Sequence, residues 1–276
     1  MKINYYRRLF SGAFAKLFFL LLATSFFGTT KSHCALPSQK FVIFTPPKCG
    51  THLVCNVVSY MLGSAPLITD QFNSIEDVTN IIEDAKRNNQ FLVSHSFTSE
   101  MLESLIKKNY KIIFILRDPR DQLISMMYWM KKGYWNEFTV SKIDDRSEQI
   151  DEMITGNIFG WSCYEGCIGV RMELLKSLPA ESVYITRFET LVGPKGRGDQ
   201  YLQNEEIQNI GEFLGLKLST EAAQNIADHS FGGTWSFREG KIGAWKEHFL
   251  PHQIDLYKAI YSDLLIRLQY ETTKDW

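Results

Sequence analysis

The 276-residue sequence lacks an excess of charge of either sign, because 30 Lys and Arg residues face 31 Asp and Glu residues. Proteins that bind nucleic acids or other polyanions through a broad electrostatic field depend on such an excess. The sequence therefore argues against that class, and an anionic ligand would have to be held by a few placed cations. The chain also lacks an internal repeat. Its 45% hydrophobic content suffices for the core of one large domain.

Cysteine is scarce as well, and the five residues are Cys34, Cys49, Cys55, Cys163 and Cys167. Their spacing matches no zinc-binding pattern and no metal cluster is visible, so we expect no metal. Cys163 and Cys167 lie four residues apart. On a helix a bridge between them would strain disulfide geometry, which favours two small buried thiols over a disulfide.

The first 35 residues differ from the rest of the chain. Lys2, Arg7 and Arg8 precede an uncharged run rich in Phe and Leu at residues 17–28, and small residues lead up to Ala35. This order is typical of a secretory signal. The run is shorter than the roughly 20 residues of a spanning helix. A cleaved signal peptide is favoured over a signal anchor. We expect a secretory or membrane-associated protein, with a cytoplasmic one as the alternative.

Short apolar runs alternate with helical patterns through the rest of the chain. Runs of β-branched and aromatic residues predict buried strands at residues 41–45, 91–94, 111–116 and 182–186. Helical spacing, caps and prolines predict helices at residues 53–62, 98–108, 121–130, 204–214 and 219–229, and a last one beginning at Pro251. Residues 131–148 and 193–198 are predicted to be loops. This alternation predicts one α/β domain over residues 38–272, with a central parallel β-sheet flanked by helices.

The loop after the first predicted strand is suited to an anion. It leads into a helix, where unsatisfied backbone N–H groups and the helix dipole favour negative charge. Lys48 adds a full charge, Gly50 lets the backbone approach closely, and Thr51 adds a hydroxyl. The loop is not that of a nucleotide triphosphatase, because its lysine precedes the glycine. An ordinary turn with an exposed lysine is the alternative.

Two further segments share this character. Arg117 follows the third predicted strand, at the edge where ligands gather in open α/β sheets. Ser125 lies on the next predicted helix, and a guanidinium and a hydroxyl there can share one phosphate. Residues 236–249 mix glycines with basic and aromatic residues. That composition indicates a loop able to close over a nucleotide.

Together these segments resemble the motifs of the sulfotransferase family that uses 3′-phosphoadenosine 5′-phosphosulfate (PAPS). Residues 47–53 resemble its 5′-phosphosulfate loop P-K-S-G-T-T-W, and residues 117–125 resemble its 3′-phosphate motif R-[ND]-P-[KR]-D-x-x-x-S. Residues 187–191 resemble R-Y-E-D-L, and residues 238–249 resemble R-K-G-x-x-G-D-W-K-x-x-F. The four motifs occur in the family's order, and the resemblance covers roughly residues 40–269.

The resemblance implies transfer of a sulfuryl group from PAPS to a hydroxyl or amine by in-line displacement, with a P-loop-like phosphosulfate loop and no metal. It implies that His95 is the catalytic base and that Lys48 stabilises the leaving oxygen. His52 is the reserve base. It also implies a set of residues that bind PAPS: Lys48, Cys49, Gly50, Thr51, His52, Arg117, Ser125, Phe188, Arg238 and Gly240.

The chain departs from the family motifs, and four of the changes bear on the site. Cys49 replaces serine, Leu53 tryptophan, Glu239 lysine and Ala244 aspartate. These changes keep open a non-catalytic protein that binds the product 3′-phosphoadenosine 5′-phosphate (PAP). A nucleotide-dependent kinase is the weaker alternative, because the Arg117 and Ser125 pair calls for a 3′-phosphate. The acceptor is not readable, and a small molecule or glycan is favoured over nucleic acid.

Overall fold

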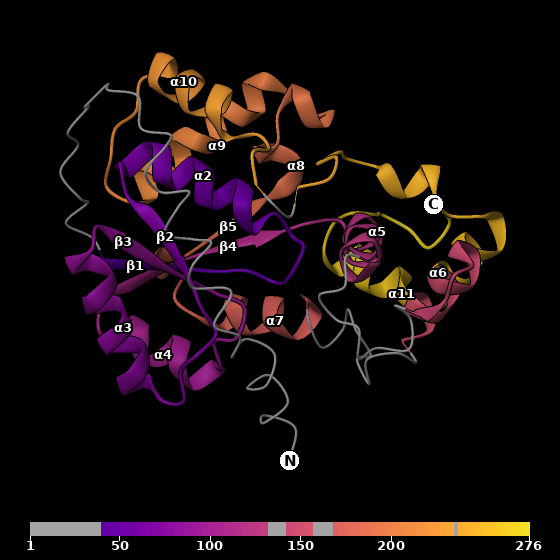
Figure 1. Ribbon diagram of the computed structural model, residues 1–276, viewed down its shortest axis with the longest axis horizontal. Coiled ribbons are helices and arrows are strands. Elements are labelled where there is room, and N and C mark those ends of the chain that lie inside the picture. Colours follow the sequence, from indigo (N-terminus) through magenta and orange to yellow (C-terminus); the bar gives the residue numbers. More distant parts are fainter. Residues whose placement is uncertain (1–39, 132–141, 157–167, 235–236) are drawn as a thin grey trace.

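The computed structural model describes residues 40–131, 142–156, 168–234 and 237–276 (Figure 1). The predicted signal or anchor, both Cys163 and Cys167, and most of the predicted loop at residues 131–148 lie outside the described residues. Five strands form one parallel sheet in the order β2-β3-β1-β4-β5. They are β1 (Lys40–Phe44), β2 (Ala65–Ile68), β3 (Gln90–Ser94), β4 (Tyr110–Leu116) and β5 (Val183–Arg187).

Helices cover both faces of the sheet, which confirms the predicted fold class. One face carries α2 (Thr51–Leu62), α8 (Phe188–Leu191), α9 (Gln200–Phe213) and α10 (Thr220–Ser230) (Figure 1). The other carries α3 (Ile75–Arg87), α4 (Ser99–Lys107) and α7 (Val170–Ser177). A third group lies beyond one end of the sheet: α5 (Pro119–Trp129), α6 (Arg146–Thr155) and α11 (Pro251–Arg267). Short 3₁₀ turns complete the chain: η5 (Ala180–Ser182), η6 (Pro194–Gly196) and η7 (Ala244–Glu247).

The core is built on the two central strands. In β1 and β4 the side chains from Val42 to Phe44 and from Ile112 to Leu116 are fully buried. The two strands pair in parallel, with Val42 opposite Ile112 and Phe44 opposite Phe114. Strands covered on both faces are expected to be continuously apolar, and these are. The sequence predicted both strands, together with β3 and β5.

Five elements were not predicted from the sequence, namely β2, α3, α6, α7 and the short α8. Residues 146–148, which it predicted to lie in a long loop, form the first turn of α6. The edge strand β2 is only half-buried and contains Pro66, which has no backbone N–H to donate and therefore argues against a strand. Parts of the residue 193–198 loop form η6, and its Gly196 is buried.

The order of the strands places two loops side by side. From β1 the chain runs outward to β2 and returns to β3, and then it crosses to β4 on the opposite side of β1. The carboxyl ends of β1 and β4 therefore form the switch point at which ligands bind in open α/β sheets. The loop with Lys48 follows β1, and Arg117 follows β4.

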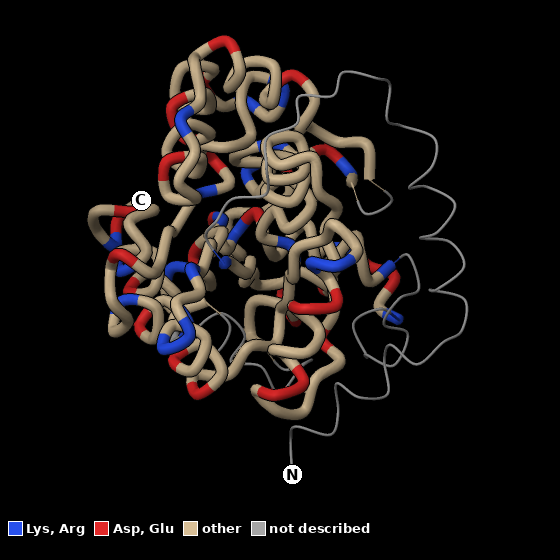
Figure 2. Tube along the Cα trace, turned by 90° about the vertical axis from the view of Figure 1, so that its left-hand side faces the viewer, with Lys and Arg blue, Asp and Glu red and all other residues tan. Residues whose placement is uncertain are grey.

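Charge is evenly spread over the described chain, as the mixture of blue and red segments in Figure 2 shows. Across the four described ranges, no helix is both long and apolar enough to cross a membrane. Within the same ranges no group of three or more His, Cys, Asp or Glu residues is placed to hold a metal ion.

Candidate functional site

The loop between β1 and α2 adopts a conformation that presents backbone N–H groups. Lys48 and Gly50 both have left-handed backbones, with φ of 65° and 104°. A Cβ on Gly50 would lie 2.8 Å from Cδ2 of Phe188 and 3.0 Å from Cδ1 of Ile115, so the position requires glycine. No described side chain caps the start of α2. The N–H groups of its first turn therefore favour an anion.

The side chains of this loop have different surroundings. The Lys48 ammonium lies 5.5 Å from the centre of the Trp129 ring on α5. Cys49 is fully buried, so only its backbone is placed to meet a ligand. The Thr51 hydroxyl lies 2.7 Å from that of Thr45. Burial, and then the charges of Lys48 and His95, lower the pKa of His52 to about 4, so its ring is neutral at pH 7.

His95 follows β3 and is held in one tautomer. Its Nδ1 lies 2.7 Å from the carbonyl oxygen of Thr45. A carbonyl can only accept, so Nδ1 carries the proton and Nε2 of the neutral ring keeps its lone pair. Burial is the main cause that lowers the pKa of His95, and the charges of Arg171 and Lys48 act in the same direction while Asp70 opposes them. The ring is therefore a neutral proton acceptor at pH 7.

Two residues that the sequence analysis missed position His95. A carboxylate oxygen of Asp70, just beyond β2, accepts hydrogen bonds from the His95 backbone N–H at 2.7 Å and from the Ser94 hydroxyl at 2.6 Å. Arg171 on α7 donates to the His95 carbonyl at 2.8 Å. Recognition of β2 would have placed Asp70 at the carboxyl edge of the sheet, whereas no local pattern marks Arg171.

Arg117 lies at the centre of the second loop. Its guanidinium stacks 4.1 Å from the centre of the buried Phe188 ring. It donates to the carbonyls of Lys48 and Lys241 at 3.3 and 3.2 Å. Its Nε is buried and has no hydrogen-bond partner among the described residues. An unpaired buried N–H is costly, so a phosphate oxygen is a fitting partner for it. The Phe188 ring lies beneath Arg117, and its contact with PAPS stays a prediction.

The loop before α11 packs against α5. The guanidinium of Arg238 lies 4.2 Å from the centre of the Tyr128 ring and donates to Glu239 at 2.6 Å. Ser125 lies three residues before Tyr128 on the same face of α5. Arg238 therefore packs against the face of α5 that also carries Ser125. Gly240 has a φ of 62°, and a Cβ there would lie 2.8 Å from the ring of Phe237. This loop thus also depends on a glycine.

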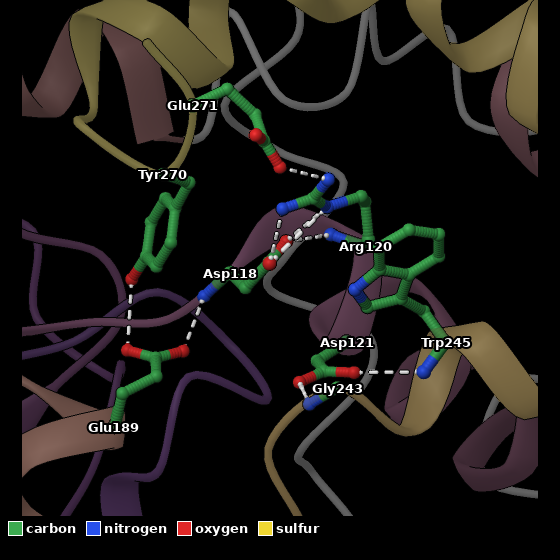
Figure 3. Close-up of polar contacts among 8 residues, drawn as sticks. All are labelled: Asp118, Arg120, Asp121, Glu189, Gly243, Trp245, Tyr270 and Glu271. Atoms are coloured by element: carbon green, nitrogen blue, oxygen red, sulfur yellow. Dashed lines mark hydrogen bonds and ion pairs between the residues drawn. The ribbon is translucent and has the colours of Figure 1, made fainter. Parts of the chain in front are cut away.

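Asp121 ties that loop to the start of α5 (Figure 3). Its carboxylate accepts from the backbone N–H groups of Gly243 at 2.7 Å and Trp245 at 2.9 Å. Burial raises the pKa of Asp121, while the charge of Arg117 lowers it. The structure therefore brings together the loop after β1, the turn after β4, α5 and the loop before α11.

The sheet and these loops define an α/β protein whose switch point carries a strand-to-helix loop suited to an anion. Residues 38–270 match the family of the sulfotransferase domain, so the chain belongs to the sulfotransferase family. This match confirms the prediction of a PAPS-dependent sulfotransferase, and the acceptor stays unidentified.

Individual relatives are distant. Sulfotransferase 6B1 of Danio rerio is 23% identical over 190 residues, which span 64% of this chain and 59% of that protein. The 3-alpha-hydroxysteroid sulfotransferase of Cavia porcellus is 22% identical over 255 residues, 80% of this chain and 82% of that protein. The crystal structure of mouse sulfotransferase SULT7A1 complexed with PAP superimposes with a TM-score of 0.62 at 16% identity, covering 82% of this chain and 84% of that one.

Proposed function

We propose that the chain sulfates a hydroxyl or amine of a small molecule or glycan, and that His95 is the base. The observation that carries this proposal is the hydrogen bond between Nδ1 of His95 and the Thr45 carbonyl, because it leaves Nε2 to accept a proton. Asp70 and Arg171 fix the backbone of the same residue. A steroid sulfotransferase among the relatives supports a small organic acceptor.

The nucleotide end of the site is assigned from the loops. Lys48, the backbone of residues 49–51 and the neutral His52 would bind the 5′-phosphosulfate at the start of α2. Arg117, Ser125, Arg238 and the backbone at Gly240 would bind the 3′-phosphate. The unpaired Nε of Arg117 supports this half of the assignment. The complex of the mouse structural neighbour with PAP is consistent with it.

The chemistry then follows from where charge develops. The acceptor oxygen or nitrogen forms a bond to sulfur while the bond from sulfur to the 5′-phosphate oxygen breaks, and that oxygen keeps the electron pair. Nε2 of His95 removes the acceptor proton, a role typically worth about 10²–10⁴-fold in rate. Lys48 and the N–H groups of α2 stabilise the negative leaving oxygen, and each placed donor is typically worth about 2.7–4 kcal/mol.

Calorimetric titration with PAP and a sulfation assay test the two halves separately. We expect micromolar PAP binding that is weakened in Lys48→Ala and Arg117→Ala and has no counterpart with ATP. With PAPS and a panel of phenols, steroids, amines and sugars, we expect turnover that His95→Gln abolishes while PAP binding persists. Absence of PAP binding by the folded protein would refute the nucleotide site. Binding without turnover of any acceptor would favour the non-catalytic alternative.

We also propose that residues 1–35 direct the domain into the secretory pathway, as their charged, apolar and small-residue order suggests. Translation of the full chain in the presence of microsomes tests this proposal. Protection of the domain from added protease is expected, with a shorter product if the signal is cleaved. A chain that stays fully digestible and of full length would instead favour a cytoplasmic enzyme.

A further inference from the structure

The last residues of the chain lie against the turn that carries Arg117. We call residues 269–276 the C-terminal tail. It leaves α11 through Gln269, whose backbone is left-handed with a φ of 61°, and the N–H of Tyr270 donates to the Leu265 carbonyl at 2.9 Å. The tail then reaches residues 118–120, which precede it by about 150 positions in the sequence. None of the four family-like motifs includes it.

One contact of the tail is with Arg120, a residue that is only 3% exposed. Its guanidinium lies 4.4 Å from the centre of the Trp245 ring and 4.5 Å from that of Trp276. It also donates to Glu271 at 2.5 Å. An arginine in contact with two rings and paired with a carboxylate in a buried place has little freedom to move.

A second contact of the tail runs through Glu189. The Tyr270 hydroxyl donates to one carboxylate oxygen of Glu189 at 3.0 Å, and the other oxygen accepts from the Asp118 backbone N–H at 2.8 Å (Figure 3). Tyr270 thereby orients the carboxylate that fixes the backbone directly after Arg117. The Arg187 guanidinium lies 4.9 Å from the centre of the Tyr270 ring, a second contact that restrains the tyrosine.

These contacts determine whether the Asp118 carboxylate pairs with the guanidinium of Arg120 or with that of Arg117. Arg120 donates to both Asp118 oxygens, from Nε at 3.0 and 3.2 Å and from a terminal nitrogen at 2.7 Å. As long as Arg120 is held, this carboxylate is neutralised and kept from Arg117. A loosened Arg120 would release an acid next to the guanidinium that the proposed function gives to the 3′-phosphate. The acid would then compete with that phosphate for Arg117.

We propose that the C-terminal tail, through Tyr270 and Trp276, is a positioning element of the 3′-phosphate site and sets the preference for nucleotides that carry a 3′-phosphate. The proposal rests on the proposed function and adds two positioning residues to it. Neither residue needs to touch the nucleotide, since both act through Asp118 and Arg120.

The test compares the binding of PAP with that of adenosine 5′-monophosphate, which lacks the 3′-phosphate, by calorimetry on the full chain. We expect Tyr270→Phe and Trp276→Ala, which change no charge, each to weaken PAP binding by roughly five- to tenfold. Binding of the monophosphate should change less than about twofold. Trp276→Phe should restore most of the PAP affinity. Tyr201→Phe on α9, at a side chain 72% exposed, and Thr272→Ala, at an exposed and uncharged position within the tail, are the matched controls.

The outcomes separate the two proposals. A wild-type protein with no preference for PAP over the monophosphate overturns the nucleotide site and the role of the tail together. A wild-type preference that Tyr270→Phe and Trp276→Ala both retain overturns the role of the tail alone. Equal losses for both nucleotides would show a general structural role and also overturn it. If Trp276→Ala does not fold, Tyr270→Phe decides by the same ratio.

Discussion

Glu239 places a negative charge next to a residue that should bind phosphate. Arg238 donates to it at 2.6 Å, and Lys241 lies 3.5 Å from its other oxygen. Glu239 stands where the sulfotransferase pattern has a lysine, so the chain carries one acid in place of one base at this point. The pair is partly exposed, and such pairs are worth up to about 1 kcal/mol. Glu239 should therefore weaken the hold of Arg238 on a nucleotide only moderately.

We predict that Glu239→Gln tightens PAP binding by about two- to fivefold, because it frees Arg238 and removes a repulsive charge. Calorimetry at low and at high salt measures this, and the gain should shrink at high salt because exposed charges are screened. Glu103→Gln, an exposed acid on α4, is the control and should leave the affinity as it is. A weaker or unchanged affinity in Glu239→Gln would place Arg238 outside the phosphate site.

His52 links the loop after β1 to the stability of the fold. Its pKa of about 4 lies below its ordinary value of 6.5, so between these values the unfolded chain binds a proton that the folded protein does not. Above pH 6.5 the titration of His52 therefore takes nothing from the free energy of unfolding. As the pH falls from 6.5 toward 4, it lowers the free energy of unfolding progressively. The shift corresponds to at most about 3 kcal/mol.

We predict that the free energy of unfolding falls more steeply between pH 6.5 and 4 in the wild type than in His52→Gln. Urea titrations at a series of pH values measure the difference, which should reach about 2–3 kcal/mol at pH 4. His229→Gln, at an exposed histidine on α10, controls for the loss of a histidine. Parallel curves for the wild type and His52→Gln would mean that His52 is solvated in the folded protein.

At the level of elements, the turn between β1 and α2 depends on Gly50. Its left-handed backbone is strained for any residue with a side chain, and an added Cβ meets the ring of Phe188. Gly63 at the end of the same helix is a natural comparison. Its φ is also positive, at 63°, but a Cβ there meets nothing within 4 Å.

We predict that Gly50→Ala costs about 2–4 kcal/mol of stability and abolishes PAP binding, because it adds strain and displaces Phe188 from beneath Arg117. Gly63→Ala should cost about 1 kcal/mol, from backbone strain alone, and should bind PAP like the wild type. Urea unfolding and calorimetry measure the two effects. If both variants showed the same stability and the same PAP affinity, the contact with Phe188 would have no role in the site.

The elements also show what the sequence could predict. The strands β1 and β4 were predicted because both are continuous apolar runs, and the loops after them because their charges stand at strand ends. Helix α3 was missed although Ser74 caps it and acids and bases occupy its two ends, signals that the sequence contains. The strand β2 was missed because it is short, half-buried and interrupted by Pro66. Because β2 was not predicted, Asp70 just beyond its end was not recognised as a residue of the site.

Other parts of the site have no local signal. Arg171 contacts His95 from 76 positions away, and Glu271 contacts Arg120 from 151 positions away. Spacing rules describe neighbours on one helix or strand, so they cannot place such pairs. These residues became recognisable only after the fold had brought α7 and the C-terminal tail to the carboxyl edge of the sheet.

At the scale of the whole molecule, the site is assembled from segments spread over most of the chain. The loop after β1, the turn after β4, the loop before α11 and the C-terminal tail converge at one edge of the sheet. The first three are joined by the hydrogen bonds of Arg117 to Lys48 and Lys241 and of Asp121 to Gly243 and Trp245. The tail is joined to the turn after β4 by the hydrogen bond of Arg120 to Glu271. A ligand that binds one of these segments should therefore slow local opening in all of them.

We predict that PAP slows amide hydrogen exchange in residues 48–54, 117–125, 240–249 and 270–276, while α3 and α4 on one face of the sheet change little. The exchange must be measured under conditions in which the amides exchange through local opening and not through global unfolding. Saturation at 100 times the dissociation constant stabilises the folded state by about 2.7 kcal/mol and would slow globally exchanging amides everywhere. In Arg117→Ala, which should bind PAP weakly, all four segments should lose this protection together, because all four depend on the bound nucleotide for it. Protection of the loop after β1 without the C-terminal tail would show that the tail folds independently of the nucleotide site, and protection centred on α3 and α4 would place the nucleotide elsewhere.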